Sequence, residues 1–120
     1  MAYIDGFVIP VLPGRRDDYL ALARSASKIF LEHGAIQVVE TIGDDVPHGK
    51  QTDFHRAVAA EEGETIVFSW IVWPSKAARD EGMARVMADD RMKPGAKEMP
   101  FDMQRIIFGG FEVVLDVRTN

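Results

Sequence analysis

The sequence predicts an α+β fold of the ferredoxin-like type, in which a βαββαβ chain forms one sheet with two helices on one face. Two observations predict this fold. The hydrophobic pattern changes along the chain between a period of two residues, typical of strands, and about 3.6 residues, typical of helices. The chain has 120 residues, the size of one ordinary domain, so we expect residues 1–120 to form a single domain.

The first third of the chain predicts a strand, a helix and a second strand. Residues 3–11 are rich in β-branched and aromatic residues and run into a Pro-Val-Leu-Pro-Gly turn, so they predict a strand. Residues 15–33 predict a helix that Gly34 stops. Its apolar stripe consists of Tyr19, Leu22, Ala23, Ala26, Ile29, Phe30 and His33. Residues 35–42 predict the second strand.

The rest of the chain predicts an inserted arm and then a strand, a helix and a strand. Residues 53–60, after a polar loop, predict a third strand or a resumption of the second, and residues 61–64 predict a hairpin connection into an apolar strand at 65–73. Ser75 is the expected N-cap of the second helix. Its inner stripe consists of Ala78, Gly82, Met83, Val86 and Met87. We expect residues 89–99 to be irregular or to form one short turn, and residues 105–116 to form a last strand with a bulge or close backbone approach at Gly109-Gly110.

The strands at 65–73 and 105–116 are apolar on both faces, although two helices can cover only one face of the sheet. A second copy of the chain would bury the free face, and closed two-fold dimers are the commonest way in which proteins do this. The sequence therefore predicts a homodimer in which two sheets pack together as a dimeric α+β barrel.

Charge and composition exclude several classes of function. The chain has 19 acidic and 14 basic residues and a net charge of −5, so we expect no nucleic-acid partner and no membrane partner. It has no cysteine, which excludes disulfides, thiolate zinc sites and a cysteine nucleophile. No signal-peptide pattern and no long apolar run is present, so we expect a cytoplasmic protein.

Four ordered segments spread over nearly the whole chain suggest a family. They are Tyr3-Ile-Asp-Gly-Phe-Val8, Asp44-Asp-Val-Pro-His-Gly-Lys-Gln-Thr-Asp-Phe54, Phe68-Ser-Trp-Ile-Val-Trp-Pro-Ser-Lys76 with Arg79-Asp80, and Met99-Pro-Phe-Asp102 with Phe108-Gly-Gly-Phe-Glu112. These segments resemble the YbaA-like proteins, small bacterial proteins with a domain of unknown function. The chain departs from the family pattern after Pro-Phe-Asp, where it has Met103-Gln104 in place of Gly-Lys.

The resemblance implies a dimeric α+β barrel. The superfamily with this fold includes cofactor-free monooxygenases, haem-degrading enzymes and muconolactone-isomerase-like proteins. The resemblance implies no established reaction for this branch, so it assigns no catalytic residue to the chain.

Glu40 is the candidate general base. It lies in a predicted strand whose alternation places it on the same side as Ile36, Val38 and Ile42, so we expect it to be at least partly buried. An ionised carboxylate without a partner is costly to bury.

Two hypotheses about Glu40 follow and remain open. In the first, it is a structural residue that pairs with a cation, Arg56 or Arg105. In the second, it is a catalytic base with a raised pKa in a pocket, and His33 or His55 is its catalytic proton partner.

Aromatic residues of the last two strands and of the loop between them predict a pocket for a flat substrate or, equally, a core or interface: Phe68, Trp70, Trp73, Phe101, Phe108 and Phe111. From this region we expect Trp70, Phe101, Arg105 and Phe108 to bind the substrate. The strand carboxylates Asp5 and Glu112 are expected to face solvent or to pair with Arg56 or Arg105.

Metal and haem sites are considered but not expected. A metal site would draw on Asp44, Asp45, His48, Asp53 and His55 in the arm, but their spacing matches no standard ligand pattern and is typical of a polar turn. Haem would need an axial ligand such as His33, which is also a common type of residue at a helix C-terminus. We therefore expect no metal and no cofactor.

Two functions remain possible from the sequence. The first is a cofactor-independent monooxygenase-like or isomerase-like enzyme that acts on a small aromatic or carbonyl compound. The second is a non-catalytic homodimer that binds a metabolite or has a regulatory role. A polar group with a shifted pKa inside the pocket would favour the first, because proton transfer needs it and binding alone does not.

Overall fold

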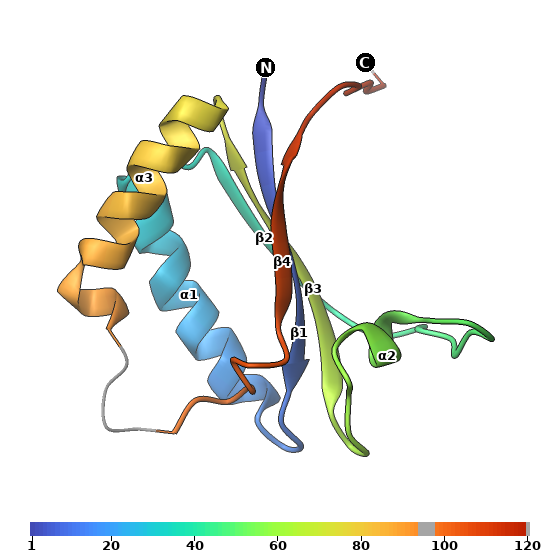
Figure 1. The fold of residues 1–120 in the computed structure, drawn as a ribbon. Coiled ribbons are helices and arrows are strands. Elements are labelled where there is room, and N and C mark those ends of the chain that lie inside the picture. Colours follow the sequence, from blue (N-terminus) through green and yellow to red (C-terminus); the bar gives the residue numbers. More distant parts are fainter. Residues whose placement is uncertain (94–97, 120) are drawn as a thin grey trace.

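The computed structural model describes residues 1–93 and 98–119 of the chain. Four antiparallel strands form one sheet in the order β2-β3-β1-β4, and the helices α1 and α3 lie side by side on one face of it (Figure 1). The elements are β1 (Tyr3–Val11), α1 (Arg16–Glu32), β2 (Gln37–Ile42), α2 (Phe54–Ala57), β3 (Thr65–Trp73), α3 (Lys76–Ala88), the 3-10 helix η1 (Asp90–Met92) and β4 (Ile107–Glu112). This is the ferredoxin-like α+β fold that the sequence predicts.

The two long helices begin and end where their sequences provide caps. Gly34 follows α1 with a φ of 111°, and the N–H of Ala35 donates to the carbonyl of Phe30, as in a Schellman motif. Ser75 caps α3, since its hydroxyl accepts a hydrogen bond from the N–H of Ala78 at 3.1 Å. The predicted stop of the first helix and the predicted N-cap of the second are both confirmed.

The prediction of a strand at 53–60 is wrong. The carboxylate of Asp53 accepts a hydrogen bond from the N–H of Arg56 at 2.7 Å and caps the single-turn helix α2. Ala59 then takes a positive φ of 48°, which a strand does not allow. The arm after β2 therefore contains a helix, which packs Phe54 edge-on against Phe68 of β3.

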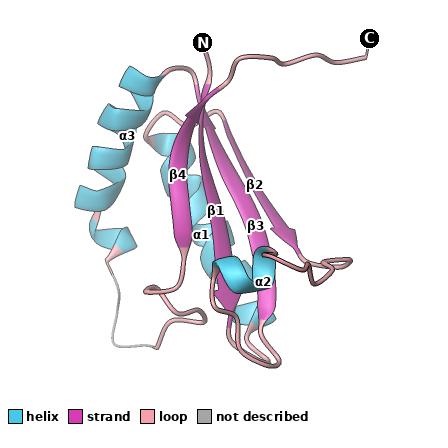
Figure 2. Ribbon diagram, turned by 45° about the vertical axis from the view of Figure 1, so that its right-hand side comes forward, coloured by secondary structure: helices cyan, strands magenta, loops and turns pink. Residues whose placement is uncertain are grey.

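The last strand also differs from the prediction. β4 ends at Glu112, and its pairing with β1 runs without a bulge through Gly109 and Gly110. The expected close approach does occur at Gly110, because a Cβ atom there would lie 2.4 Å from the Tyr3 hydroxyl and 2.5 Å from the Arg79 guanidinium. Residues 113–119 leave the sheet as an extended tail (Figure 2).

The two faces of the sheet differ in chemistry. The face toward α1 and α3, here called the inner face, carries most of the core, including Ile9, Val67 and Trp73. Three predicted inner positions are exposed instead: Leu22 of α1, Ile36, which precedes β2, and Met87, which lies on the outer side of α3.

The opposite face, here called the free face, carries no charged side chain within the strands. It consists of Ile4, Gly6, Val8, Pro10, Gln37, Val39, Thr41, Ile66, Phe68, Trp70, Val72, Ile107, Gly109 and Phe111. The arm reaches this face through Phe54, while Phe68, Ile107 and Phe111 remain exposed. In the described part of the chain, no helix is long and apolar enough to cross a membrane.

Candidate active site

A cavity of about 960 Å³ lies between α1 and the inner face of the sheet. Residues 91–93 and 98–101 also line it. Its wall is mainly apolar, with Phe7, Phe30, Val38, Ile71 and Phe101 among the lining residues. A space of this size and character is typical of sites for small organic molecules.

Three polar side chains meet in the wall of this cavity: Tyr19, Glu40 and Ser69. Glu40 lies on the inner face of β2, directly opposite Ser69 of β3 in the register. Tyr19 comes from the buried stripe of α1, and its hydroxyl donates a hydrogen bond to Oε1 of Glu40. The Ser69 hydroxyl also hydrogen-bonds to this pair.

Burial raises the pKa of Glu40, although the hydrogen bonds from Tyr19 and Ser69 act in the opposite direction. Burial also raises the pKa of Tyr19, and the carboxylate beside it raises it further. Among the described residues, no cation contributes to the shift at Glu40. The carboxyl group is therefore stabilised by neutral donors, and a protonated form is easier to reach than in an ion pair.

The expected cation partners of Glu40 are engaged elsewhere. Arg105 binds Glu64 at 2.6 Å and Asp102 at 2.8 Å, and it does not line the cavity. Arg56 donates to the carbonyl of Lys50 and lies near Asp53 in the arm. The hypothesis of a Glu40–arginine pair is wrong, since Tyr19 of α1 already occupies the carboxylate.

Of the expected substrate-binding residues, Phe101 lines the same cavity as Glu40, and its ring packs edge-on against Tyr19 at 5.9 Å. Trp70 projects from the free face, so the sheet separates it from Glu40. Phe108 lies on β4, is 77% exposed and stacks on Phe7 at 6.3 Å. The structure thus brings Phe101 to Glu40 and places the other three residues away from it.

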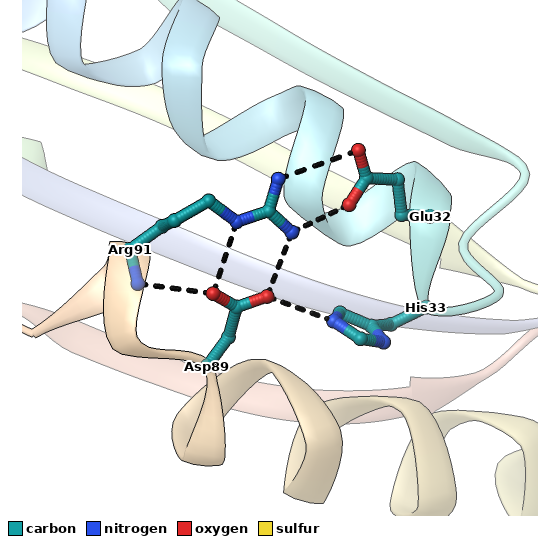
Figure 3. Close-up of polar contacts among 4 residues, drawn as sticks. All are labelled: Glu32, His33, Asp89 and Arg91. Atoms are coloured by element: carbon teal, nitrogen blue, oxygen red, sulfur yellow. Dashed lines mark hydrogen bonds and ion pairs between the residues drawn. The ribbon is translucent and has the colours of Figure 1, made fainter.

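His33 lies at the C-terminal end of α1 in a charged network with Asp89, Arg91 and Glu32 (Figure 3). Its Nε2 is 3.1 Å from Oδ2 of Asp89, and Arg91 binds both Asp89 at 2.7 Å and Glu32 at 2.5 Å. The Arg91 guanidinium, followed by His33, lowers the pKa of Asp89. The network ties the segment after α3 to α1, and His33 is not among the residues of the cavity wall.

His55 lies in the arm, where its Nε2 is 3.0 Å from the carbonyl of Val46 and its ring stacks on His48 at 4.2 Å. Asp53 is used as the helix cap and also accepts a hydrogen bond from Gly49. Over residues 1–93 and 98–119, no three histidine, aspartate or glutamate side chains come together in a way that could hold a metal ion. The arm therefore has the geometry of a polar turn.

Tyr19 and Ser69 were not expected as functional residues, yet both contact Glu40. The pattern holds a weak signal for each. Ser69 is the one polar residue between Ile66 and Ile71 of β3, and Tyr19 is the one residue of the α1 stripe with a hydroxyl on a long side chain. A buried polar group needs a hydrogen-bond partner, and here Tyr19 and Ser69 are the partners of Glu40.

A second carboxylate, Asp5 on β1, is also buried on the inner face, contrary to the expectation that it faces solvent or pairs with Arg56 or Arg105. It accepts a hydrogen bond from Nε1 of Trp73 at 2.9 Å, and Nε of Arg79 lies 3.6 Å away. Arg79 also donates to the Tyr3 hydroxyl at 2.9 Å. We call this group, Tyr3, Asp5, Trp73 and Arg79, the Asp5 corner.

Comparison with known sequences identifies the family. The profile of the family described as "Protein of unknown function (DUF1428)" matches residues 2–103. The chain belongs to this family. The DUF1428 chain is 49% identical over 116 residues to "Uncharacterized protein YbaA" of Escherichia coli K12, across 97% of the chain and 99% of YbaA. The YbaA of Shigella flexneri matches equally well. The resemblance to YbaA-like proteins is confirmed.

Among solved structures, the DUF1428 chain resembles SnoaB of Streptomyces nogalater, which is described as a cofactor-independent oxygenase. The TM-score is 0.55, and the match covers 98% of both chains at 11% sequence identity. At this identity the likeness shows a shared fold, and it agrees with the α+β architecture that the sequence predicts.

Proposed function

We propose that the protein is a cofactor-independent enzyme of the isomerase or monooxygenase type, in which Glu40 removes a proton from a small aromatic or carbonyl compound bound in the cavity. One observation carries the proposal. Glu40 is the one charged residue that the strands contribute to a mainly apolar cavity, and hydroxyl groups rather than cations hold it.

The environment of Glu40 suits a general base. A carboxylate in an ion pair is a weak base, because the cation lowers its pKa. Burial instead raises the pKa of Glu40, which brings its basicity nearer to that needed at neutral pH. The apolar wall formed by residues such as Phe7, Phe30 and Phe101 would hold a flat substrate against it.

The fold shared with SnoaB supports the class of chemistry. A reaction without a cofactor must begin from the substrate's own electrons, and removal of a proton leaves an electron pair on the substrate. This pair can either take a proton at a different atom, which isomerises the compound, or reduce molecular oxygen. Both reactions share the first step that Glu40 would perform.

The test measures hydrogen–deuterium exchange next to the carbonyl of α-tetralone by proton NMR in deuterated buffer. The protein is expected to accelerate exchange, and Glu40→Gln is expected to lower the acceleration by at least about 100-fold, because it keeps the shape and removes the base. Glu81→Gln is the matched control, since Glu81 is exposed on α3 and paired with Arg85.

Two outcomes would contradict the enzyme proposal. One is exchange by Glu40→Gln at the rate of the unmodified protein. The other is saturable binding of α-tetralone, followed by NMR line broadening, without any acceleration of exchange. The second outcome would favour the alternative of a non-catalytic, metabolite-binding protein.

We also propose that the protein is a homodimer in which the free faces of two copies pack together. This face lacks charge in the strands and leaves Phe68, Ile107 and Phe111 exposed, more than a monomer commonly leaves open to water. Two copies of a chain with a net charge of −5 repel each other, and this repulsion is weakest where their uncharged faces meet. Identical apolar faces are complementary through a two-fold axis.

Sedimentation equilibrium at low micromolar concentration tests the dimer. We expect twice the chain mass of 13.4 kDa for the unmodified protein and the mass of a monomer for Phe111→Asp, which places a charge in the free face. Met87→Asp is the control, because Met87 is equally exposed but lies on α3. A single species of 13.4 kDa for the unmodified protein would refute the dimer.

A further inference from the structure

Tyr19 is a second proton-bearing group in the cavity, and proton removal by Glu40 alone gives it no role. The side chain is 5% exposed, and its ring is held edge-on by Phe101. Its hydroxyl donates directly to Glu40. A phenol in contact with a carboxylate can exchange a proton with it without help from solvent, so the two groups can act as one acid–base pair.

We infer that Tyr19 and Glu40 together catalyse keto–enol tautomerisation of a neutral carbonyl compound, with Glu40 as the base at carbon and Tyr19 as the acid at the carbonyl oxygen. The inference rests on the proposed function, because it uses the same cavity and the same base. It adds the reaction class, the substrate class and a second catalytic residue.

The step balances without an oxidant or a cofactor. Glu40 takes a proton from the carbon beside the carbonyl, and the electron pair of the broken C–H bond forms the C=C bond. The π electrons of the carbonyl take the hydroxyl proton of Tyr19, which completes the enol. The Glu40 carboxylic acid then returns its proton to the Tyr19 oxygen across the hydrogen bond that joins them. Both residues regain their starting state, and the reverse reaction uses the same atoms.

The charges around the cavity favour a neutral substrate. The other charged lining residues come from the start of α1 and from the segment after α3, and Glu98 is one of them. Among the described residues, each cation of the lining is held by a carboxylate: Arg15 by Asp18 at 2.6 Å, Arg91 by Glu32 at 2.5 Å and Lys93 by Asp90 at 2.9 Å. An anionic substrate would have to compete with these pairs and would face Glu40, whereas a neutral aryl ketone or diketone fits the apolar wall.

Ser69 is a positioning residue in this scheme. It lies directly across from Glu40 in the sheet, and its hydroxyl bonds to the Tyr19–Glu40 pair. Because it belongs to β3, which is paired on both sides in the sheet, it holds the carboxyl group while Tyr19 turns toward the substrate oxygen.

The experiment uses benzoylacetone, a neutral aryl diketone. Diluting it into buffer from an apolar solvent, where its enol is enriched, starts a relaxation to the keto–enol equilibrium that absorbance follows. The unmodified protein is expected to accelerate this relaxation, and Glu40→Gln is expected to remove the acceleration.

Tyr19→Phe keeps the ring against Phe101 but removes the acid. Its kcat is expected to fall by about 10- to 100-fold at nearly unchanged KM, because Tyr19 acts in the transition state. The acid limb of the pH–rate profile should also move to higher pH, since the hydrogen bond that lowers the pKa of Glu40 is lost. Ser69→Ala should lower kcat only several-fold.

The outcomes separate the two proposals. A Tyr19→Phe protein with the kcat and the pH profile of the unmodified protein would overturn the role of Tyr19, even if Glu40→Gln is inactive and the proposed function stands. Full activity of Glu40→Gln would overturn the proposed function itself. If Tyr19→Phe does not fold, meta-fluorotyrosine at this position keeps the hydroxyl and makes it more acidic, and an unchanged rate would then count against the inference.

Discussion

Asp5 and Glu40 both project from the inner face of the sheet, but their neighbours differ. Asp5 meets the indole N–H of Trp73 and the guanidinium of Arg79, and it is not among the residues that line the cavity. Glu40 meets two hydroxyl groups and opens on a cavity of about 960 Å³. A buried carboxylate paired with a cation fixes neighbouring elements, whereas one held by neutral donors beside a cavity can change its protonation state.

Burial raises the pKa of both carboxyl groups, and only at Asp5 does a cation oppose this shift. A raised pKa alone therefore does not separate a structural carboxylate from a catalytic one. The partners and the open space beside the group make the distinction.

The prediction with the largest expected effect concerns Gly82 of α3, which packs against Trp73 of the Asp5 corner. A Cβ atom on Gly82 would lie 2.4 Å from the backbone oxygen of His33 and 2.4 Å from the ring of Trp73, so α3 would have to move away from both. Gly82→Ala should therefore destabilise the protein by about 3 kcal/mol in urea unfolding. In an unobstructed helix the same change would stabilise by about 1 kcal/mol, so a stabilised variant would show that the corner is loosely packed.

The sequence predicted the position of Glu40 better than it predicted the residues that contact Glu40. The alternation of β2 placed Glu40 on the buried face with Val38 and Ile42, as observed, because strand periodicity is a local property. Its partner Tyr19 lies 21 residues away on a helix, and only the docking of α1 on the sheet decides which hydroxyl reaches the carboxylate.

Contacts between elements that are distant in the sequence also explain the burial of Asp5. Asp5 was expected at an exposed strand end, but Arg79, 74 positions later, reaches it through the space that Gly110 leaves on the opposing strand. The strand expected at 53–60 failed for a local reason, since an Asp three residues before Arg56 fits a helix cap as well as a turn. The order of the elements was predictable because each long element carries its own period and stop signals.

The second prediction compares matched substitutions at the two carboxylates. Asp5→Asn keeps an acceptor for Trp73 but leaves the partly buried guanidinium of Arg79 with only the exposed carboxylate of Asp80, 3.3 Å away. We expect the unfolding free energy, measured in urea, to fall by about 2 kcal/mol. This is less than for a fully buried pair, because the Arg79 side chain is 24% exposed. Glu40→Gln leaves no cation among the described residues without a partner. Its unfolding free energy should therefore fall by less than about 1 kcal/mol. Equal losses would remove the distinction between the two sites.

The smallest expected effect concerns pH. A carboxyl group whose pKa is higher in the folded than in the unfolded state binds its proton more tightly when folded, so the stability it contributes is present at low pH and is lost as pH rises. For Glu40 this loss begins near the ordinary carboxyl pKa and ends at the raised one. Glu40→Gln lacks this titration, while Asp5 and all other groups titrate in both proteins and cancel in the difference.

The difference in unfolding free energy between Glu40→Gln and the unmodified protein should therefore shift in favour of the variant as pH rises through this window. Urea unfolding from about pH 3.5 to 8 measures it, a range that brackets ordinary and raised carboxyl pKa values. The opposite slope, in which the unmodified protein gains on the variant with rising pH, would mean that the fold lowers the pKa of Glu40. In that case hydrogen bonds to the carboxylate would outweigh its burial, and Glu40 would lack the raised basicity on which the proposed function depends.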